Sequence, residues 1–297
     1  MHPAPVLARR WEATAALILL AAVVACFLPV LAAFYQTWAH PGGGLENRAI
    51  ALVAIIWLVT RQRQLLDAPL AGIASQVAGF VLLVVAVGLV QLPLLTAQGA
   101  AFVVALVGLV LFCWGRAGLA ALWRPAVIAA IVFTLNGLAD GFLPRYTGLV
   151  QGLQHLVAGL AAYLLWMFGF AVELQETTLR VAGTAGIDVY AACSGTHSLL
   201  EVGALALTAI LTISERSWRA NLGYLLACLA IALGFNVLRI LLLAYASAAL
   251  GQETFDALHH GWGASLYGNG ISVVTVLFTS WFFQWNPFEP RSVSGSG

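Results

Sequence analysis

The second half of the chain contains a small set of residues whose side chains together could carry out acyl transfer. Cys193 lies in the sequence Ala-Ala-Cys-Ser-Gly, Arg239 lies in a long apolar stretch, and His259 and His260 follow as a pair. A thiolate can attack a carbonyl carbon, a histidine can accept the thiol proton and later protonate a leaving amine, and an arginine can neutralise an oxyanion. This combination predicts a cysteine acyl-transfer site, with His260 as the alternate to His259.

A second grouping competes for the same residues. Cys193, His197 and Glu201 are spaced four residues apart, so on a helix they lie along one face. His197 is therefore an alternate base, and His197 and Glu201 could instead join His259 or His260 around a metal ion. Because one His and one Glu at this spacing are weak evidence for a metal, we predict a site with no metal and no other cofactor.

The composition indicates the solvent in which these residues work. Only 8% of the 297 residues are charged, 62% are hydrophobic, and the mean hydropathy is +0.94. A soluble domain carries about 25% charged residues. The composition therefore excludes an ordinary soluble enzyme, a disordered chain and a nucleic-acid binder with a basic surface. It predicts a polytopic membrane protein whose partners include membrane lipids and no nucleic acid.

Apolar stretches of about 20 residues predict an all-α fold with about eight transmembrane helices. The breaks between the stretches carry turn residues or charges. The predicted spans are 14–36, 47–62, 70–93, 98–115, 121–138, 195–213, 221–247 and 265–284.

The arginine residues predict how these spans are oriented, because cytoplasmic loops carry an excess of positive charge. With both termini in the cytoplasm, nine arginines fall inside, three fall outside, and Arg239 alone lies within a span. The predicted cytoplasmic set is Arg9, Arg10, Arg61, Arg63, Arg116, Arg124, Arg216, Arg219 and Arg291, and the outer set is Arg48, Arg145 and Arg180.

This topology decides how the apolar stretch 147–171 is interpreted. The fifth span ends outside and the span from Gly195 begins outside, so one crossing by 147–171 would break the parity. We therefore predict a helix that lies in the outer leaflet or re-enters it, and a tightly bent double crossing is the alternative. The predicted organisation is a membrane frame at 1–138, a catalytic membrane region at 139–286 and a flexible tail at 287–297, within one integral membrane domain.

The same topology brings the reactive residues to one side of the membrane. Arg239 lies 18 residues past the cytoplasmic start of its span, or about 27 Å along the helix. This depth is near the outer boundary of the hydrocarbon, where Cys193 and the histidine pair are also predicted. Asn236, one turn before Arg239, either orients the guanidinium or caps a kink after Gly234.

Three motifs in this order resemble the exosortase/archaeosortase family. They are Ala192-Cys193-Ser194-Gly195, then Asn236-Val237-Leu238-Arg239-Ile240, then His259 with Gly263 four residues later. The resemblance covers about residues 140–285. The chain departs from the family where Thr196-His197 follows the cysteine motif, which leaves a local role for His197 open.

The resemblance implies an integral membrane cysteine protease or transpeptidase of a bacterial or archaeal cytoplasmic membrane, with an outward-facing site. Its implied substrates are secreted proteins with a C-terminal motif, a transmembrane helix and a basic cluster. It also implies that Cys193 is the nucleophile, Arg239 the transition-state stabiliser and His259 the acid/base. The alternative is a non-enzymatic transporter or assembly factor in which Arg239 binds an anionic substrate or lipid.

Overall fold

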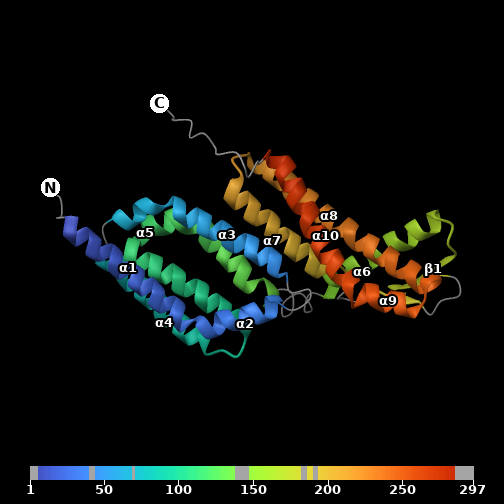
Figure 1. The fold of residues 1–297 in the computed structure, drawn as a ribbon, viewed down its shortest axis with the longest axis horizontal. Helices are drawn as coiled ribbons and strands as arrows, with labels where there is room; N and C mark the ends of the chain where they lie inside the picture. The colour runs from blue at the N-terminus through green and yellow to red at the C-terminus, as the bar shows by residue number, and fades with distance from the viewer. Residues whose placement is uncertain are drawn as a thin grey trace.

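The computed structural model describes residues 6–39, 44–68, 71–137, 147–181, 186–189 and 193–284. The predicted tail 287–297 and Arg145 lie outside these ranges. Figure 1 shows the first five helices gathered on one side of the molecule and the helices from α6 onward on the other. The described part of the chain is helical apart from one small sheet, as the sequence predicts.

The N-terminal group packs around a cluster of aromatic side chains. The elements are α1 (Val6–Cys26), α2 (Leu28–Ala39), α3 (Leu45–Arg61), the 3-10 helix η1 (Arg63–Asp67), α4 (Ile73–Val90) and α5 (Leu95–Gly137). Phe34 and Trp38 from α2 contact Phe133 of α5, with ring centroids 5.2 and 5.5 Å apart. α1 and α2 meet at an angle of 58°, so the predicted first span 14–36 is a bent pair.

α5 folds back on itself and therefore contributes two antiparallel segments. Phe102 and Phe133 lie 31 residues apart, yet their ring centroids are only 5.0 Å apart, whereas a straight helix would separate them by about 46 Å. The reversal falls at Gly115, whose φ of 63° favours glycine. A Cβ at Gly99 would clash with the backbone oxygen of Phe133, so the two segments are in close contact. These segments match the predicted spans 98–115 and 121–138.

The C-terminal group carries the reactive residues. Its elements are α6 (Thr147–Met167), β1 (Val172–Gln175), β2 (Thr178–Val181), β3 (Ile187–Asp188), α7 (Thr196–Ile213), α8 (Trp218–Tyr245), the π-helical η5 (Ala246–Leu250), α9 (Gln252–His259) and α10 (Trp262–Phe283). The strands form an antiparallel sheet in the order β1-β2-β3. α7 packs against α3 and α5 as well as against α8 and α10, and so joins the two groups.

α8 and η5 together form one continuous helical element beside the site. They run from Trp218 to Leu250, 33 residues or about 50 Å, which exceeds the roughly 30 Å of a membrane hydrocarbon core. The first half of α8 packs with α7 and α10 through Tyr224 and Cys228. The second half packs with α6 and the sheet through Ile240 and Ala244. Arg239 lies near the point at which α8 stops packing on α7 and α10 and begins to pack on α6 and the sheet.

The described residues contain six helices long and apolar enough to cross a membrane, or seven if the bent pair α1–α2 is one span. Three features separate this number from the predicted eight: α5 counts once although it folds back, α3 has only 17 residues, and α6 is counted although it is not one of the eight predicted spans. The exact count of eight therefore stays a prediction. α6 is one unbroken helix, so the alternative of a tightly bent double crossing is wrong for residues 147–167. α6 is among the six, so its predicted position in the outer leaflet stays a prediction.

Candidate active site

The structure brings the sulfur of Cys193 close to the imidazole of His259. The Sγ atom lies 3.8 Å from Nε2 of His259, a distance at which the thiol proton can pass to the ring. Cys193 immediately precedes α7, and His259 is the last residue of α9. Cys193 is 5% exposed, so its thiol is largely shielded from water.

The turn that carries Cys193 is held by Asn236 of α8. The Asn236 side-chain amide donates a hydrogen bond of 3.0 Å to the backbone oxygen of Cys193. Gly195 caps α7 with a φ of 83°, and a Cβ there would lie 2.8 Å from the Asn236 amide. Only glycine meets both demands without strain. Among the described contacts Asn236 donates to this carbonyl, and its predicted role of orienting the Arg239 guanidinium stays a prediction.

The two histidines predicted as alternatives are in contact with each other. Nδ1 of His259 lies 2.7 Å from Nε2 of His260, so one ring donates to the other. His259 also stacks on Phe255, with ring centroids 5.4 Å apart. These two contacts fix the ring plane and leave Nε2 of His259 facing the sulfur. The geometry therefore places His260 behind His259, as a group that can orient it.

Burial lowers the pKa of His259 below its usual value of 6.5, and electrostatic interactions with His260 and Arg239 lower this pKa further. The nearby carboxylate of Asp256 acts in the opposite direction. The net effect keeps the imidazole neutral at neutral pH, which is the form that accepts a proton from a thiol.

Arg239 lies on α8 and stacks over an aromatic ring of α10. Its guanidinium carbon is 5.2 Å from the ring centroid of Tyr267, and the Tyr267 hydroxyl lies 3.2 Å from Oγ of Ser198 on α7. Nε of Arg239 is buried without a hydrogen-bond partner. Stacking uses the face of the guanidinium and leaves its in-plane N–H donors for an anion. Tyr267 is not among the predicted site residues, because its one signal in the sequence is a polar group near the outer end of the last predicted span.

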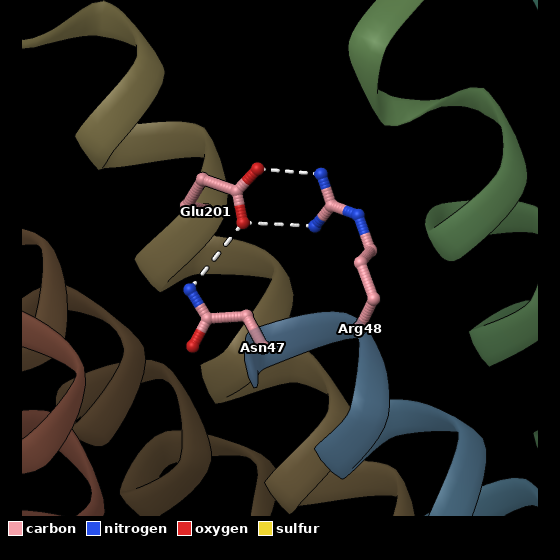
Figure 2. A network of polar contacts seen from close by, with 3 residues as sticks. All are labelled: Asn47, Arg48 and Glu201. Carbon is pink, nitrogen blue, oxygen red and sulfur yellow. Dashed lines mark hydrogen bonds and ion pairs between the residues drawn. The ribbon is translucent and has the colours of Figure 1, made fainter. Parts of the chain in front are cut away.

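Glu201 belongs to a different network, which Figure 2 shows. Its two carboxylate oxygens accept hydrogen bonds of 2.8 and 2.5 Å from the guanidinium of Arg48 on α3, and Asn47 donates a third of 3.4 Å. Arg48 is 2% exposed. Arg48 is therefore a second arginine, besides Arg239, that lies within a helix of the bundle, and its predicted position on the outer side of the membrane stays a prediction. The position of Arg48 inside the predicted span 47–62 was the sequence signal for this burial.

His197 is exposed on α7, one turn beyond Cys193. Among the described side chains, no three His, Cys, Asp or Glu residues are grouped closely enough to hold a metal ion. The grouping of His197 and Glu201 with His259 or His260 around a metal is therefore not formed, since Glu201 pairs with Arg48 instead.

The arrangement can support nucleophilic chemistry at a carbonyl. The imidazole of His259 is in reach of the thiol, and Arg239 is close enough to influence the charge of that imidazole. A cation near the reacting atoms lowers the free energy of a thiolate and of an oxyanion alike. All four cysteines are free, so the Cys193 sulfur is not held in a disulfide.

Comparison with known proteins identifies one family. The model of the transmembrane exosortase family matches residues 38–278, which include Cys193, Arg239 and His259 and most of the N-terminal helices. No curated protein and no solved structure matches the chain. The match begins about 100 residues before the region 140–285, in which the motifs alone carry the resemblance. The chain therefore belongs to the transmembrane exosortase family.

Proposed function

We propose that the protein is a membrane-embedded cysteine protease or transpeptidase that cleaves a C-terminal sorting signal of secreted proteins. Membership of the exosortase family supports a membrane protease or transpeptidase. The observation that carries the proposal is the 3.8 Å contact between the Cys193 sulfur and Nε2 of His259. A packing cysteine would have no need of a basic nitrogen at this distance.

The proposed reaction begins with proton transfer from the Cys193 thiol to Nε2 of His259. The thiolate attacks the scissile carbonyl carbon, and the resulting oxyanion is neutralised by the free N–H donors of Arg239. When the tetrahedral intermediate collapses, the carbon–nitrogen bond breaks and His259 returns its proton to the leaving amine. A thioester on Cys193 remains, and water or an acceptor amine releases the acyl group and regenerates the thiol.

The position of Arg239 also supports a substrate that reaches the site from the lipid. Arg239 lies 21 residues along α8 from Trp218, or about 31 Å, which corresponds to one thickness of the hydrocarbon core. A substrate anchored by its own transmembrane helix would present the polar residues next to that helix at this depth. We propose that this end of the bundle faces outward, with both termini in the cytoplasm.

Cys193→Ala tests the proposal in cells that also produce a candidate substrate with a C-terminal transmembrane helix and a basic cluster. Processing is expected to stop, and wild-type protein mixed with substrate is expected to yield a hydroxylamine-sensitive adduct on Cys193 by mass spectrometry. Cys228→Ala is the matched control, because Cys228 is also buried but packs between α7 and α10. If Cys193→Ala processes as fast as wild type, the protease proposal fails and the non-enzymatic role for Arg239 takes its place.

A further inference from the structure

A cavity of about 310 Å³ lies at the end of the bundle opposite Cys193. Its walls come from the end of α3, from the α5 segment that follows the reversal at Gly115, and from the last turn of α7. The lining residues that matter here are Leu58, Arg61, Gln62, Trp123, Arg124 and Thr212. Thr212 lies 16 residues along α7 from Thr196, or about 24 Å, so this cavity is separate from the site around Cys193.

The cavity holds two positive charges that no described carboxylate neutralises. The guanidinium of Arg61 stacks on Trp57 at 3.9 Å from the ring centroid, and that of Arg124 lies 5.7 Å from the centroid of Trp123. Across the described residues the one ion pair is that of Arg48 with Glu201. Because stacking occupies the faces of the guanidiniums, their in-plane N–H donors remain for an anion. Arginine forks fit the oxygens of a phosphate particularly well.

Apolar side chains surround the cavity, and they favour a lipid over a soluble anion as its ligand. Trp123 is 48% exposed, and Val59 and Val127, which lie close to lining residues in sequence, are 44% and 41% exposed. Indole rings favour the boundary between head groups and acyl chains, and exposed valines favour the chains themselves. A head group in the cavity would therefore leave its acyl chains against an apolar surface.

We propose that this cavity binds the phosphate of an anionic phospholipid, such as phosphatidylglycerol, in the leaflet at this end of the bundle. The volume is at the lower end of the range for small-molecule sites and suits a glycerophosphate head group. The uncompensated pair of arginines favours a head group of net negative charge over a zwitterionic one, whose amine they would repel. This site does not depend on the proposed chemistry at Cys193.

Lipid binding to the purified full-length protein, followed by native mass spectrometry, tests the proposal. The probes are phosphatidylglycerol, phosphatidylcholine, and soluble glycerol phosphate and inorganic phosphate. The pocket variant is Arg61→Gln with Arg124→Gln, and the matched control is Arg63→Gln with Arg219→Gln, which removes two positive charges outside the cavity lining. Phosphatidylglycerol should bind the pocket variant roughly tenfold more weakly, or worse, while the control stays within about twofold of wild type.

Three outcomes would overturn the proposal. Equal weakening by both double variants would mean that the lipid responds to net charge and not to this cavity. Equal affinity for phosphatidylcholine would remove the role of the negative head group, and tight binding of the soluble phosphates would identify a soluble ligand. If the Gln variant does not fold, Arg61→Lys with Arg124→Lys replaces it: it keeps the charge, loses the forked donors and should bind with intermediate strength.

Discussion

The sulfur of Cys193 lies 3.8 Å from Nε2 of His259, although 66 residues separate them in the chain. Cys193 is held by Asn236 of α8, while His259 is held by Phe255 and His260 at the end of α9. Two independent sets of contacts therefore meet at one sulfur–nitrogen pair. Each set can be altered separately, so the function of the pair can be tested without removing either member.

The first prediction separates the two histidines. His259→Ala should slow thioester formation by about 10²- to 10⁴-fold, because the base and later acid is lost. His260→Ala should have a smaller effect, since it removes the group that orients the His259 ring and leaves the base itself in place. The rate of adduct formation on Cys193 measures both. His155→Ala is the control, because His155 is an exposed residue of α6. Full activity in His259→Ala would move the base to His260 or to His197.

The second prediction concerns the acidic limb of the activity profile. Because burial and the neighbouring cations lower the pKa of His259, the neutral base persists below pH 6.5, and activity should fall only below that pH. His260→Ala removes a lowering influence, so the limb should move to higher pH. Asp256→Asn removes the raising influence, so the limb should move to lower pH. Processing rates measured across pH test this. If both variants moved the acidic limb in the same direction, His259 would not be the group that titrates.

The third prediction tests the turn at the start of α7. Gly195→Ala should cost about 1–2 kcal/mol from the positive φ alone, with a further cost from the clash with Asn236. Asn236→Ala should cost about 1–3 kcal/mol, because the buried carbonyl of Cys193 loses its donor. Thermal unfolding in detergent, alongside processing rate, measures both. Gly234→Ala is the control on α8, the helix that carries Asn236, since a Cβ at Gly234 meets nothing within 4 Å.

Much of the site was readable from the sequence because its chemistry lies in short motifs. Cys193, Arg239 and His259 each stand out locally, as a thiol before a helix, an arginine in an apolar stretch and a histidine in an outer loop. The spans also follow from apolar length, and even the reversal of α5 falls at a predicted break. These features need no knowledge of which helices touch.

The features that were missed all depend on contacts between distant segments. Glu201 and Arg48 are 153 residues apart, and nothing near either residue indicates that α3 packs on α7. Tyr267 reads as one more aromatic residue in a span until α8 and α10 are side by side. The small sheet is also absent from the predicted elements, because its strands have four residues or fewer and give too short a pattern to recognise.

The fourth prediction separates the ring of Tyr267 from its hydroxyl. Tyr267→Phe keeps the aromatic face over which Arg239 lies, so most activity should remain. Tyr267→Leu removes the face, so the guanidinium should lose its position and the processing rate should fall further. Ser198→Ala should resemble Tyr267→Phe, since each removes one partner of the same hydrogen bond. If Tyr267→Phe and Tyr267→Leu lowered the processing rate equally, the hydroxyl of Tyr267 and not its ring would position Arg239.

The fifth prediction uses the pair shown in Figure 2 to test how the two helical groups are joined. Glu201→Gln leaves the guanidinium of Arg48 buried without its counter-charge, which should destabilise the protein by about 3–5 kcal/mol. Arg48→Met combined with Glu201→Leu removes both charges and should cost much less, because an apolar pair needs no desolvation. The midpoint of thermal unfolding in detergent gives the coupling between the two positions. If the double variant were as unstable as the sum of the single variants, the pair would not be the contact that holds α3 against α7.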